Sequence, residues 1–348
     1  MGASTGSSSA ALGTAVVNGV LKTAKTDATL KPLGATHQAL KKCVDKAVPG
    51  RRLFAFGSIV VYGFMEAGSD VDFVILDPKQ IADGKGLDAA TMQARQLQAH
   101  TLSQVARATR AAHRALKIEE VKRTRVPVLR CSKAQPPAFP VPFDITADRR
   151  NGVRNSWLLR SYFDQYPQAR WLALAVKRWS KDTQMNGQMG FLTSYAFNIL
   201  VVHYYRAALG KMQHVPLEHA DVAKAPDLPV GMPLQKPADM AAFGDEVAGF
   251  FDFYLNDFRY DDDVVTLSRD GATTTAQLGW TREAEDALKM KASDDEGLGK
   301  VSYRLCIEDP FEVNLNVGRN VSAFKLDVFK QNLAQGRLSG MGWLQKSL

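Results

Sequence analysis

Cysteine is scarce in this chain of 348 residues, which contains only Cys43, Cys131 and Cys306. Their number is odd, their spacing is wide and no C-x-x-C pair occurs, so the sequence offers neither a zinc ribbon nor a disulfide framework. A reducing compartment is the simplest interpretation, because disulfides persist mainly in oxidising ones.

Long hydrophobic runs are also missing. No apolar stretch approaches the roughly 18 residues that a membrane-spanning helix needs, so we expect no membrane span. The first fifty residues contain no arginine, whereas mitochondrial transit peptides are rich in arginine. We therefore expect a cytoplasmic location, and the sequence leaves a mitochondrial one open.

The sequence also shows no separate nucleic-acid-binding module, because there is no C₂H₂ motif, no RRM signature and no appended basic tail. It contains no internal repeat either. The net charge of +8 nevertheless favours an anionic partner. Residues 101–182 contain 17 Lys or Arg and 6 Asp or Glu, and this basic stretch surrounds Asp144. Such a field concentrates phosphates near that aspartate.

Three aspartates carry the chemistry that the sequence predicts. The run 69–76 reads as a β-strand, because its apolar residues are β-branched or bulky and a proline follows it. In such a strand the side chains of Asp70 and Asp72 point to one face. Asp144 lies in a second strand-like run, 141–145. Three carboxylates that converge from two strands form a hard oxygen site suited to Mg²⁺.

A glycine–serine pair, Gly57-Ser58, precedes the aspartates. A strand end, a loop and a helical turn at this spacing present backbone N–H groups to phosphates. Gly57 allows a close backbone approach, Ser58 offers a hydroxyl to a β- or γ-phosphate, and Ser69 is a further candidate for the same role. An Asp-x-Asp alone is usually a solvated strand end, so the combination is what favours a nucleotide site.

The pattern of Gly57-Ser58, Asp70-x-Asp72 and Asp144 resembles the DNA polymerase β nucleotidyltransferase superfamily. Later segments resemble the terminal uridylyltransferases, and most closely the small trypanosomatid enzymes that carry only the catalytic core. These segments are Asn151-Gly152-Val153-Arg154-Asn155-Ser156, Thr193-Ser194-Tyr195-Ala196, Phe250-Phe251-Asp252-Phe253-Tyr254 and Ile307-Glu308-Asp309-Pro310-Phe311-Glu312.

The resemblance implies a two-domain fold, α/β in one domain and mostly α in the other. We expect 1–35 to be a disordered start plus an N-terminal helix packed on the C-terminal domain. Residues 36–150 would form the mixed-sheet nucleotidyltransferase catalytic domain. Residues 151–348 would form a helical, PAP-associated-like domain for nucleotide recognition. The active site is expected in the cleft between the two domains.

Residue patterns predict the individual elements. The Gly/Ser/Ala-rich composition of 1–13 predicts disorder. Apolar spacing predicts a long helical stretch with Leu97, Leu102, Val105 and Leu116 facing inward. The expected strands are 52–56, 69–76, 118–123, 126–131, 141–145 and a strand-like 311–317. The expected helices lie within 14–49 and at 88–117, 153–164, 168–182, 194–209, 239–257 and 281–291.

The resemblance also assigns roles. Asp70 and Asp72 would bind both of two Mg²⁺ or Mn²⁺ ions, and Asp144 would bind the ion that activates an RNA 3′ hydroxyl. Lys177 and Lys181 lie four residues apart on a predicted helix, so they share a face and can clamp a triphosphate tail. The alternative for this pair is an ordinary solvated helix face.

The next predicted helix opens with Ser194 and Tyr195. Ser194 reads as an N-cap, and a helix N-terminus attracts phosphate. Tyr195 resembles the family's base-stacking aromatic, with a core tyrosine as the alternative. The Asn155 amide can bond the uracil O2 and the ribose 2′ hydroxyl, and Ser156 beside it is a further contact. The alternative for both is an N-cap for a helix at 156–164.

Base identity is assigned by resemblance to Asp309, Glu312 and Arg319. Uracil presents a donor at N3 and cytosine an acceptor, so a carboxylate pair accepts from uracil N3–H, directly or through water, and repels cytosine. Unpaired buried groups then penalise the wrong base. Arg319 either balances that charge or reaches the triphosphate, and the sequence does not decide between the two.

The function that follows is an RNA uridylyltransferase. It would add UMP from UTP to the 3′ hydroxyl of single-stranded RNA without a template, release pyrophosphate, and use neither DNA nor a membrane as partner. One alternative is a noncanonical poly(A) polymerase that uses ATP. Another is a catalytically silent RNA-binding scaffold, against which the presence of all three aspartates argues. The RNA target and any protein partner stay unknown from the sequence.

Overall fold

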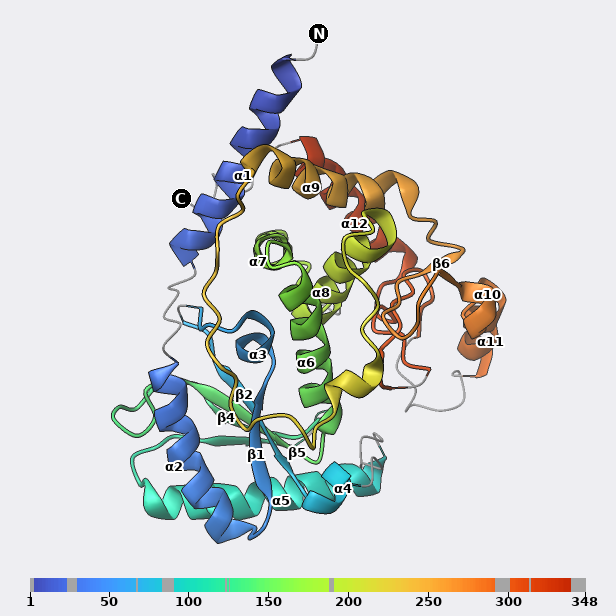
Figure 1. Ribbon diagram of the computed structural model, residues 1–348. Coiled ribbons are helices and arrows are strands. Elements are labelled where there is room, and N and C mark those ends of the chain that lie inside the picture. The colour runs from blue at the N-terminus through green and yellow to red at the C-terminus, as the bar shows by residue number, and fades with distance from the viewer. Residues whose placement is uncertain are drawn as a thin grey trace. The chain divides into compact units, whose positions relative to one another are not determined.

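The chain divides into two compact units (Figure 1). The computed structural model describes residues 3–23, 30–66, 68–82, 91–122, 124, 126–187, 191–291, 301–312 and 314–338. The sheet unit comprises Ala24–Arg160 and Leu217–Pro233, and the helical unit comprises Met1–Thr23, Ser161–Pro216 and Leu234–Leu348. The division falls inside helix α6 (Arg150–Gln165), ten residues beyond the boundary expected from the sequence.

The sheet unit is built on five strands in the order β1-β2-β5-β4-β3. Strand β2 pairs in parallel with β5, and the other neighbours pair antiparallel, so the predicted mixed sheet is confirmed. Its strands are β1 (Arg52–Phe56), β2 (Val71–Leu76), β3 (Glu119–Val121), β4 (Val128–Cys131) and β5 (Phe143–Ala147).

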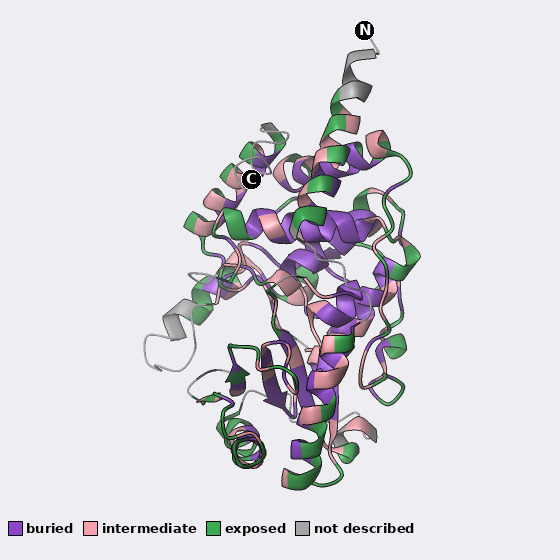
Figure 2. Ribbon diagram, turned by 90° about the vertical axis from the view of Figure 1, so that its left-hand side faces the viewer, coloured by how far each residue is buried: buried purple, intermediate pink, exposed green. Residues whose placement is uncertain are grey.

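Alternation along the strands gives this sheet two different faces. One face carries Leu53, Phe73 and Ile145 and packs against helices α2 (Lys31–Ala47) and α5 (Met92–Ala112) (Figure 1). The strands at its centre are purple in Figure 2, because most of their residues are buried. The other face carries a smaller apolar cluster and the polar residues described below. The members of that cluster are Phe54, Val74, Leu76, Val153, Val222 and Ala225.

Helix α5 shows where the sequence pattern succeeded and where it failed. Its N-cap is Thr91, whose side chain accepts from the Ala94 N–H at 3.1 Å. Leu102 and Val105 are buried as predicted, but Leu97 is 43% exposed, so its predicted inward orientation is wrong. The predicted start at residue 88 lies outside the described residues, and the helix ends at Ala112 rather than at 117.

The helical unit contains most of the remaining helices. Its α-helices are α1 (Ala3–Thr23), α7 (Ala169–Asp182), α8 (Ser194–His203), α9 (Met240–Asp252), α10 (Thr275–Leu278), α11 (Arg282–Lys291) and α12 (Ala323–Leu338). Helices α8 and α9 each continue into a π-helical turn, Tyr204–Ala208 and Phe253–Asp257. His203 ends α8, and burial lowers its pKa to about 4, as suits a structural histidine in an apolar helix.

Helix α1 overturns the predicted disorder for residues 3–13. It packs against α9 and α7, and Val16, Val17 and Val20 are buried. The approach to α9 depends on two small residues: a Cβ built on Gly13 would lie 2.1 Å from the Met240 carbonyl oxygen, and one built on Gly244 would lie 1.8 Å from that of Ser9. Tertiary packing therefore stabilises a helix whose glycine and serine content is unfavourable.

Smaller elements were not foreseen. They are α4 (Pro78–Ala82), a 3₁₀ turn (Leu217–Ala220) and the strand pair β6 (Asp263–Val264) and β7 (Thr273–Thr274), whereas α3 (Ser58–Tyr62) is the helical turn expected at Gly57-Ser58. Helix α12 was missed as well. The strand predicted at 311–317 does not form among its described residues, since one isolated bridge joins Glu308 to Asn316 and Asn314 has a φ of 62°. None of the described helices is long and apolar enough to cross a bilayer.

We predict that Gly244→Ala lowers the free energy of unfolding by about 1–3 kcal/mol, because the added methyl forces α1 away from α9. Urea denaturation followed by circular dichroism measures the change. The control is Gly34→Ala in α2, where an added Cβ meets nothing within 4 Å and alanine improves helix propensity. Equal midpoints for the two variants would contradict the α1–α9 contact.

Candidate active site

One row of residues runs across the sheet from edge to edge. Strand register places Phe56 opposite Asp72, Asp72 opposite Asp144, Asp144 opposite Arg130, and Arg130 opposite Glu119. Register partners point to the same face, so these side chains share the face that α2 and α5 do not cover. Two of the three predicted aspartates are therefore immediate neighbours in the parallel β2–β5 ladder.

Arg130 supplies the cation in this row. Its Nε lies 3.1 and 3.2 Å from the two Asp144 carboxylate oxygens, and its Nη2 lies 2.8 Å from Oδ2. The hydrogen-bonded Asp144 carboxylate raises the pKa of Arg130 above its ordinary value, with smaller contributions from Glu119 and Asp70. The Arg130 side chain is 47% exposed, so it can leave Asp144 without disturbing the core.

Asp70 lies one residue before β2 and is exposed. Across the part of the chain that the structure describes, no group of three His, Cys, Asp or Glu side chains is arranged to hold a metal ion. The donor set still fits a divalent cation: two carboxylates from adjacent strands and a third nearby are hard oxygen ligands. A guanidinium already compensates Asp144, which shows that the position favours positive charge.

The turn at Gly57 brings the backbone against Asp72. Gly57 has φ 75° and ψ −148°, and a Cβ at this position would lie 2.4 Å from Asp72 Oδ2. Only glycine fits both the conformation and the contact. The Gly57 N–H donates to Ser156 Oγ at 2.8 Å, and Ser156 in turn donates to the Gly152 carbonyl at 2.7 Å. Ser156 therefore ties helix α6 to the turn.

Helix α6 begins at Arg150, so Asn155 and Ser156 lie inside it. The alternative of an N-cap for 156–164 is therefore wrong. Asn155 is half-buried one residue before Ser156. Ser58 is the first residue of α3 and is half-buried. Ser69 donates its hydroxyl to the Glu66 carbonyl at 2.8 Å and leaves its oxygen lone pairs as acceptors.

In the helical unit, Lys177 and Lys181 lie one turn apart on α7. Lys177 is 8% exposed, whereas Lys181 is exposed. The amide of Asn186 bonds Ser180 Oγ at 3.0 Å and Ser194 Oγ at 2.9 Å, so it links the end of α7 to the start of α8.

The N-cap of α8 is Thr193, whose hydroxyl accepts from the Ala196 N–H at 3.3 Å. The prediction that Ser194 caps the helix is wrong by one residue. Ser194 occupies the first helical position, and its hydroxyl bonds Asn186 instead.

Tyr195 and Asp309, which are 114 residues apart in the sequence, lie in contact. The Tyr195 hydroxyl donates to Asp309 Oδ2 at 3.1 Å, and Asp309 Oδ1 accepts from the backbone N–H groups of Phe311 and Glu312, each at 2.9 Å. Asp309 is 7% exposed. This arrangement fixes the carboxylate beside an aromatic ring and orders the turn that carries Glu312.

Asn316, which sequence reasoning missed, holds this segment in place. Its Nδ2 donates to the carbonyls of Ser302 and Leu305 at 3.0 and 3.2 Å, and its Oδ1 accepts from the N–H groups of Ile307 and Gly318, each at 2.9 Å. The residue is 3% exposed. One amide therefore satisfies four backbone groups on both sides of Asp309.

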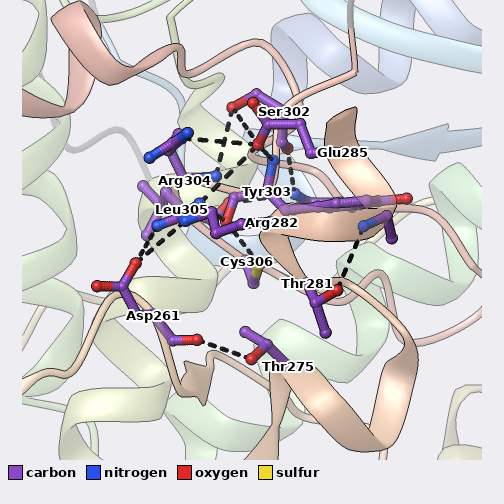
Figure 3. A network of polar contacts seen from close by, with 12 residues as sticks. Asp261, Thr275, Thr281, Arg282, Glu285, Ser302, Tyr303, Arg304, Leu305 and Cys306 are labelled. Carbon is purple, nitrogen blue, oxygen red and sulfur yellow. Dashed lines mark hydrogen bonds and ion pairs between the residues drawn. The ribbon is translucent and has the colours of Figure 1, made fainter. Parts of the chain in front are cut away.

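Glu285 of α11 anchors the start of the same segment (Figure 3). Its Oε2 accepts from the Tyr303 N–H at 2.7 Å and lies 3.7 Å from Arg304 Nε, and Figure 3 shows Arg282 and Ser302 around it. The Glu285 side chain is 4% exposed, so the neighbouring cations and donors compensate its charge.

Arg319 joins the frame through its backbone. Its carbonyl accepts from the Ser302 N–H at 2.8 Å, and its N–H donates to the Asn316 carbonyl at 3.2 Å. No sequence motif signalled Asn316 or Glu285. Arg130 could have been found from its place in the basic stretch 101–182, but its partner follows only from the strand order.

Comparisons with known proteins show what the chain resembles over most of its length. A family model described as "Poly(A) RNA polymerase, mitochondrial-like, central palm domain" matches residues 16–164. A second, described as "Cid1 family poly A polymerase", matches residues 243–315. The chain is similar to Terminal uridylyltransferase 4 of Trypanosoma brucei brucei, with 45% identity over 333 residues, which cover 95% of this chain and 97% of the relative.

Solved structures give the same result. Terminal uridylyl transferase 4 from Trypanosoma brucei with bound UTP and UMP matches with a TM-score of 0.84 and 44% identity, covering 96% of this chain and 99% of that one. The same protein with bound ATP matches with a TM-score of 0.86 and 42% identity, again covering 96% and 99%.

We predict that Asn316→Ala lowers the free energy of unfolding by at least about 2 kcal/mol, because it leaves buried backbone donors and acceptors unpaired. Denaturant unfolding measures the loss. Asn320→Ala, at an exposed position four residues further on, is the matched control and should change stability by less than about 0.5 kcal/mol. A similar small change for both variants would show that the Asn316 amide does not hold the segment.

Proposed function

The chain belongs to the terminal uridylyltransferase family of nucleotidyltransferases, and we propose that it transfers UMP from UTP to the 3′ hydroxyl of single-stranded RNA without a template. The observation that carries the proposal is the register of β2 and β5, which sets Asp72 beside Asp144. In the reaction the RNA hydroxyl attacks the α-phosphate in line and pyrophosphate leaves.

Asp70, Asp72 and Asp144 are the residues that would hold the divalent metals typical of this family. Two Mg²⁺ or Mn²⁺ ions bound there would lower the pKa of the acceptor hydroxyl and would neutralise negative charge on the leaving pyrophosphate. Asp144 would bind one of these ions or accept the hydroxyl proton once Arg130 leaves its oxygens. The Gly57 turn lets a phosphate approach the backbone beside Asp72, and Ser58 and Ser69 would add side-chain contacts.

Residues of the helical unit would bind the rest of the nucleotide. Lys177 and Lys181 share a face of α7 and suit the triphosphate tail. Ser194 at the start of α8 would add a hydroxyl contact there, and Arg319 would either reach the same phosphates or balance the acidic turn. These contacts orient the nucleotide, and orientation lowers the barrier by reducing the entropy lost at the reaction step.

Tyr195, Asp309 and Glu312 would read the base. The ring of Tyr195 would stack on uracil, and the Asp309 carboxylate, held by Tyr195 and two backbone N–H groups, would accept from uracil N3–H with Glu312. A carboxylate at that position rejects an acceptor, so cytosine is disfavoured. In the sheet unit, Asn155 would bond the uracil O2 and the ribose 2′ hydroxyl, and Ser156 holds the turn beside it.

ATP is the competing donor. The Trypanosoma brucei relative has solved structures with bound ATP as well as with UTP and UMP, so binding alone does not settle base choice. The carboxylate at Asp309 favours UTP because the ring nitrogen of uracil, N3–H, is a donor, whereas the ring nitrogen on the same edge of adenine, N1, is an acceptor. Extension of a short single-stranded RNA with each of the four NTPs and Mg²⁺, in parallel, decides between the two. Extension with ATP alone would overturn the uridylyl assignment, and no extension with any NTP would support a silent scaffold.

We predict that Asp144→Asn lowers kcat at least about 10³-fold, because it removes a charge that acts in the transition state. Steady-state RNA extension gives kcat, and an unchanged urea midpoint shows that the fold survives. The matched control is Asp45→Asn in the same unit, an acid that is 51% exposed and pairs with Lys41, which should retain full activity. Full activity in Asp144→Asn would refute the metal assignment.

We predict graded effects at Tyr195. Tyr195→Phe keeps the ring but loses the bond to Asp309, so KM for UTP should rise about 5-fold, as the loss of about 1 kcal/mol implies. Tyr195→Ala also loses base stacking worth about 1–3 kcal/mol, and KM should rise further. The readout is KM against kcat at saturating RNA. If Tyr195→Ala leaves KM unchanged, the base binds elsewhere.

A further inference from the structure

A strongly basic pocket lies on the sheet unit, beside the row of side chains that contains Asp72, Asp144 and Arg130. Its volume is about 570 Å³, and its charged lining consists of Arg110, Arg114, Lys117, Glu119, Arg130 and Lys133. The lining carries five cations against one carboxylate. A hollow of this size with so uneven a charge favours an anionic occupant.

The cations of the lining are not equally available. Arg110 lies 2.8 Å from Glu120 and also donates to the Ile118 carbonyl at 3.1 Å. Burial raises the pKa of Glu120, but its bonds with Lys122, Arg110 and Ser103 outweigh that and lower the pKa to about 2. Glu120 is therefore ionised at neutral pH and pairs with both Arg110 and Lys122.

Arg114, Lys117 and Lys133 differ from Arg110. All three are exposed, and no described carboxylate lies within ion-pair distance of any of them. Three uncompensated cations around one hollow repel each other, which weakens the fold slightly and favours a polyanionic guest.

Strand register fixes where this pocket begins. Arg130 is opposite Asp144, and Glu119 is opposite Arg130. Neighbouring strands lie about 4.7–4.9 Å apart, so the lining starts one strand from the catalytic carboxylate, and beyond Glu119 it includes Arg110 of α5 and residues that follow this helix. A chain whose 3′ hydroxyl sits at Asp144 can enter the pocket with its next phosphates.

We propose that this pocket binds the phosphodiester backbone of the acceptor RNA upstream of its 3′-terminal phosphodiester, through Arg114, Lys117 and Lys133. The proposal rests on the proposed function, because the position of the acceptor hydroxyl at Asp144 comes from it. The contacts are to phosphates and carry no base code. Arg130 stands between the pocket and Asp144, and a phosphate that takes its guanidinium frees both Asp144 oxygens.

The test uses the full chain with all three cations neutralised, Arg114→Gln, Lys117→Gln and Lys133→Gln together. Extension with saturating UTP is compared on a twelve-nucleotide oligo(U) and on the dinucleotide UpU, which is too short to reach the pocket. We expect KM for the longer RNA to rise at least about tenfold, and the rise for UpU to be at least about tenfold smaller. The binding constant K of the longer RNA also depends on salt. The slope of log K against log salt concentration should become shallower by about 0.7 for each phosphate that the triple variant no longer neutralises.

The matched control is Lys122→Gln. It removes one cation from the same edge of the sheet, but Lys122 pairs with Glu120 and does not line the pocket, so KM for both RNAs should stay unchanged. The assignment of the pocket to RNA is overturned if KM for the longer RNA is unchanged in the triple variant, or if KM for UpU rises equally. A rise of the same size in Lys122→Gln also overturns it, because that would point to a diffuse charge effect.

Direct binding separates this proposal from the proposed function. Fluorescence anisotropy of labelled oligo(U) with the unmodified chain and the triple variant needs no catalysis. If the unmodified chain extends no RNA with any NTP, the proposed function fails, yet a tenfold weaker Kd in the triple variant still supports an RNA pocket. Equal Kd values overturn the pocket even if extension works. Poly(glutamate) that binds in place of RNA would assign the pocket to an acidic protein instead.

Discussion

The pairing of β2 with β5 is the constraint on which the site depends. Parallel register sets Asp72 opposite Asp144, and the period-two alternation of the strand puts Val71 and Phe73 on the other face, against α2 and α5. A slip of one residue would place the aspartates in the apolar core and the core residues at the site. The same hydrophobic pattern that selects the register therefore places the carboxylates, and the core and the chemistry are specified together.

The two units hold their carboxylates by different means. In the sheet unit an accessible cation compensates Asp144, because Arg130 is half-exposed and another cation can take its place. In the helical unit Asp309 accepts from two backbone N–H groups of its own turn and from the Tyr195 hydroxyl of α8. An exchangeable partner suits a group whose charge environment changes during reaction. Fixed partners suit a group that must present one acceptor direction to a base.

Local patterns predicted the five strands of the sheet and most helices, because each depends on residues that are close in the sequence. Contacts between distant segments were not predictable. Ser156 was read as a ligand contact or an N-cap, yet it bonds the Gly57 N–H 99 residues away. Arg130 became a partner of Asp144 only through the strand order. The predicted disorder near the N-terminus failed for the same reason, since α1 owes its stability to α9 rather than to its own glycine- and serine-rich sequence.

The segment around Asp309 shows why base recognition needs residues that never meet the base. Between Ser302 and Arg319 the described backbone forms only isolated bridges, so no continuous ladder fixes its path. Side chains fix the path of the backbone instead. Asn316 bonds backbone groups from separate parts of the segment, and Glu285 holds its start. A carboxylate misplaced by a fraction of a hydrogen-bond length loses its preference for one base edge. Selectivity in such a segment therefore depends as much on the buried amide and the buried carboxylate behind it as on Asp309 itself.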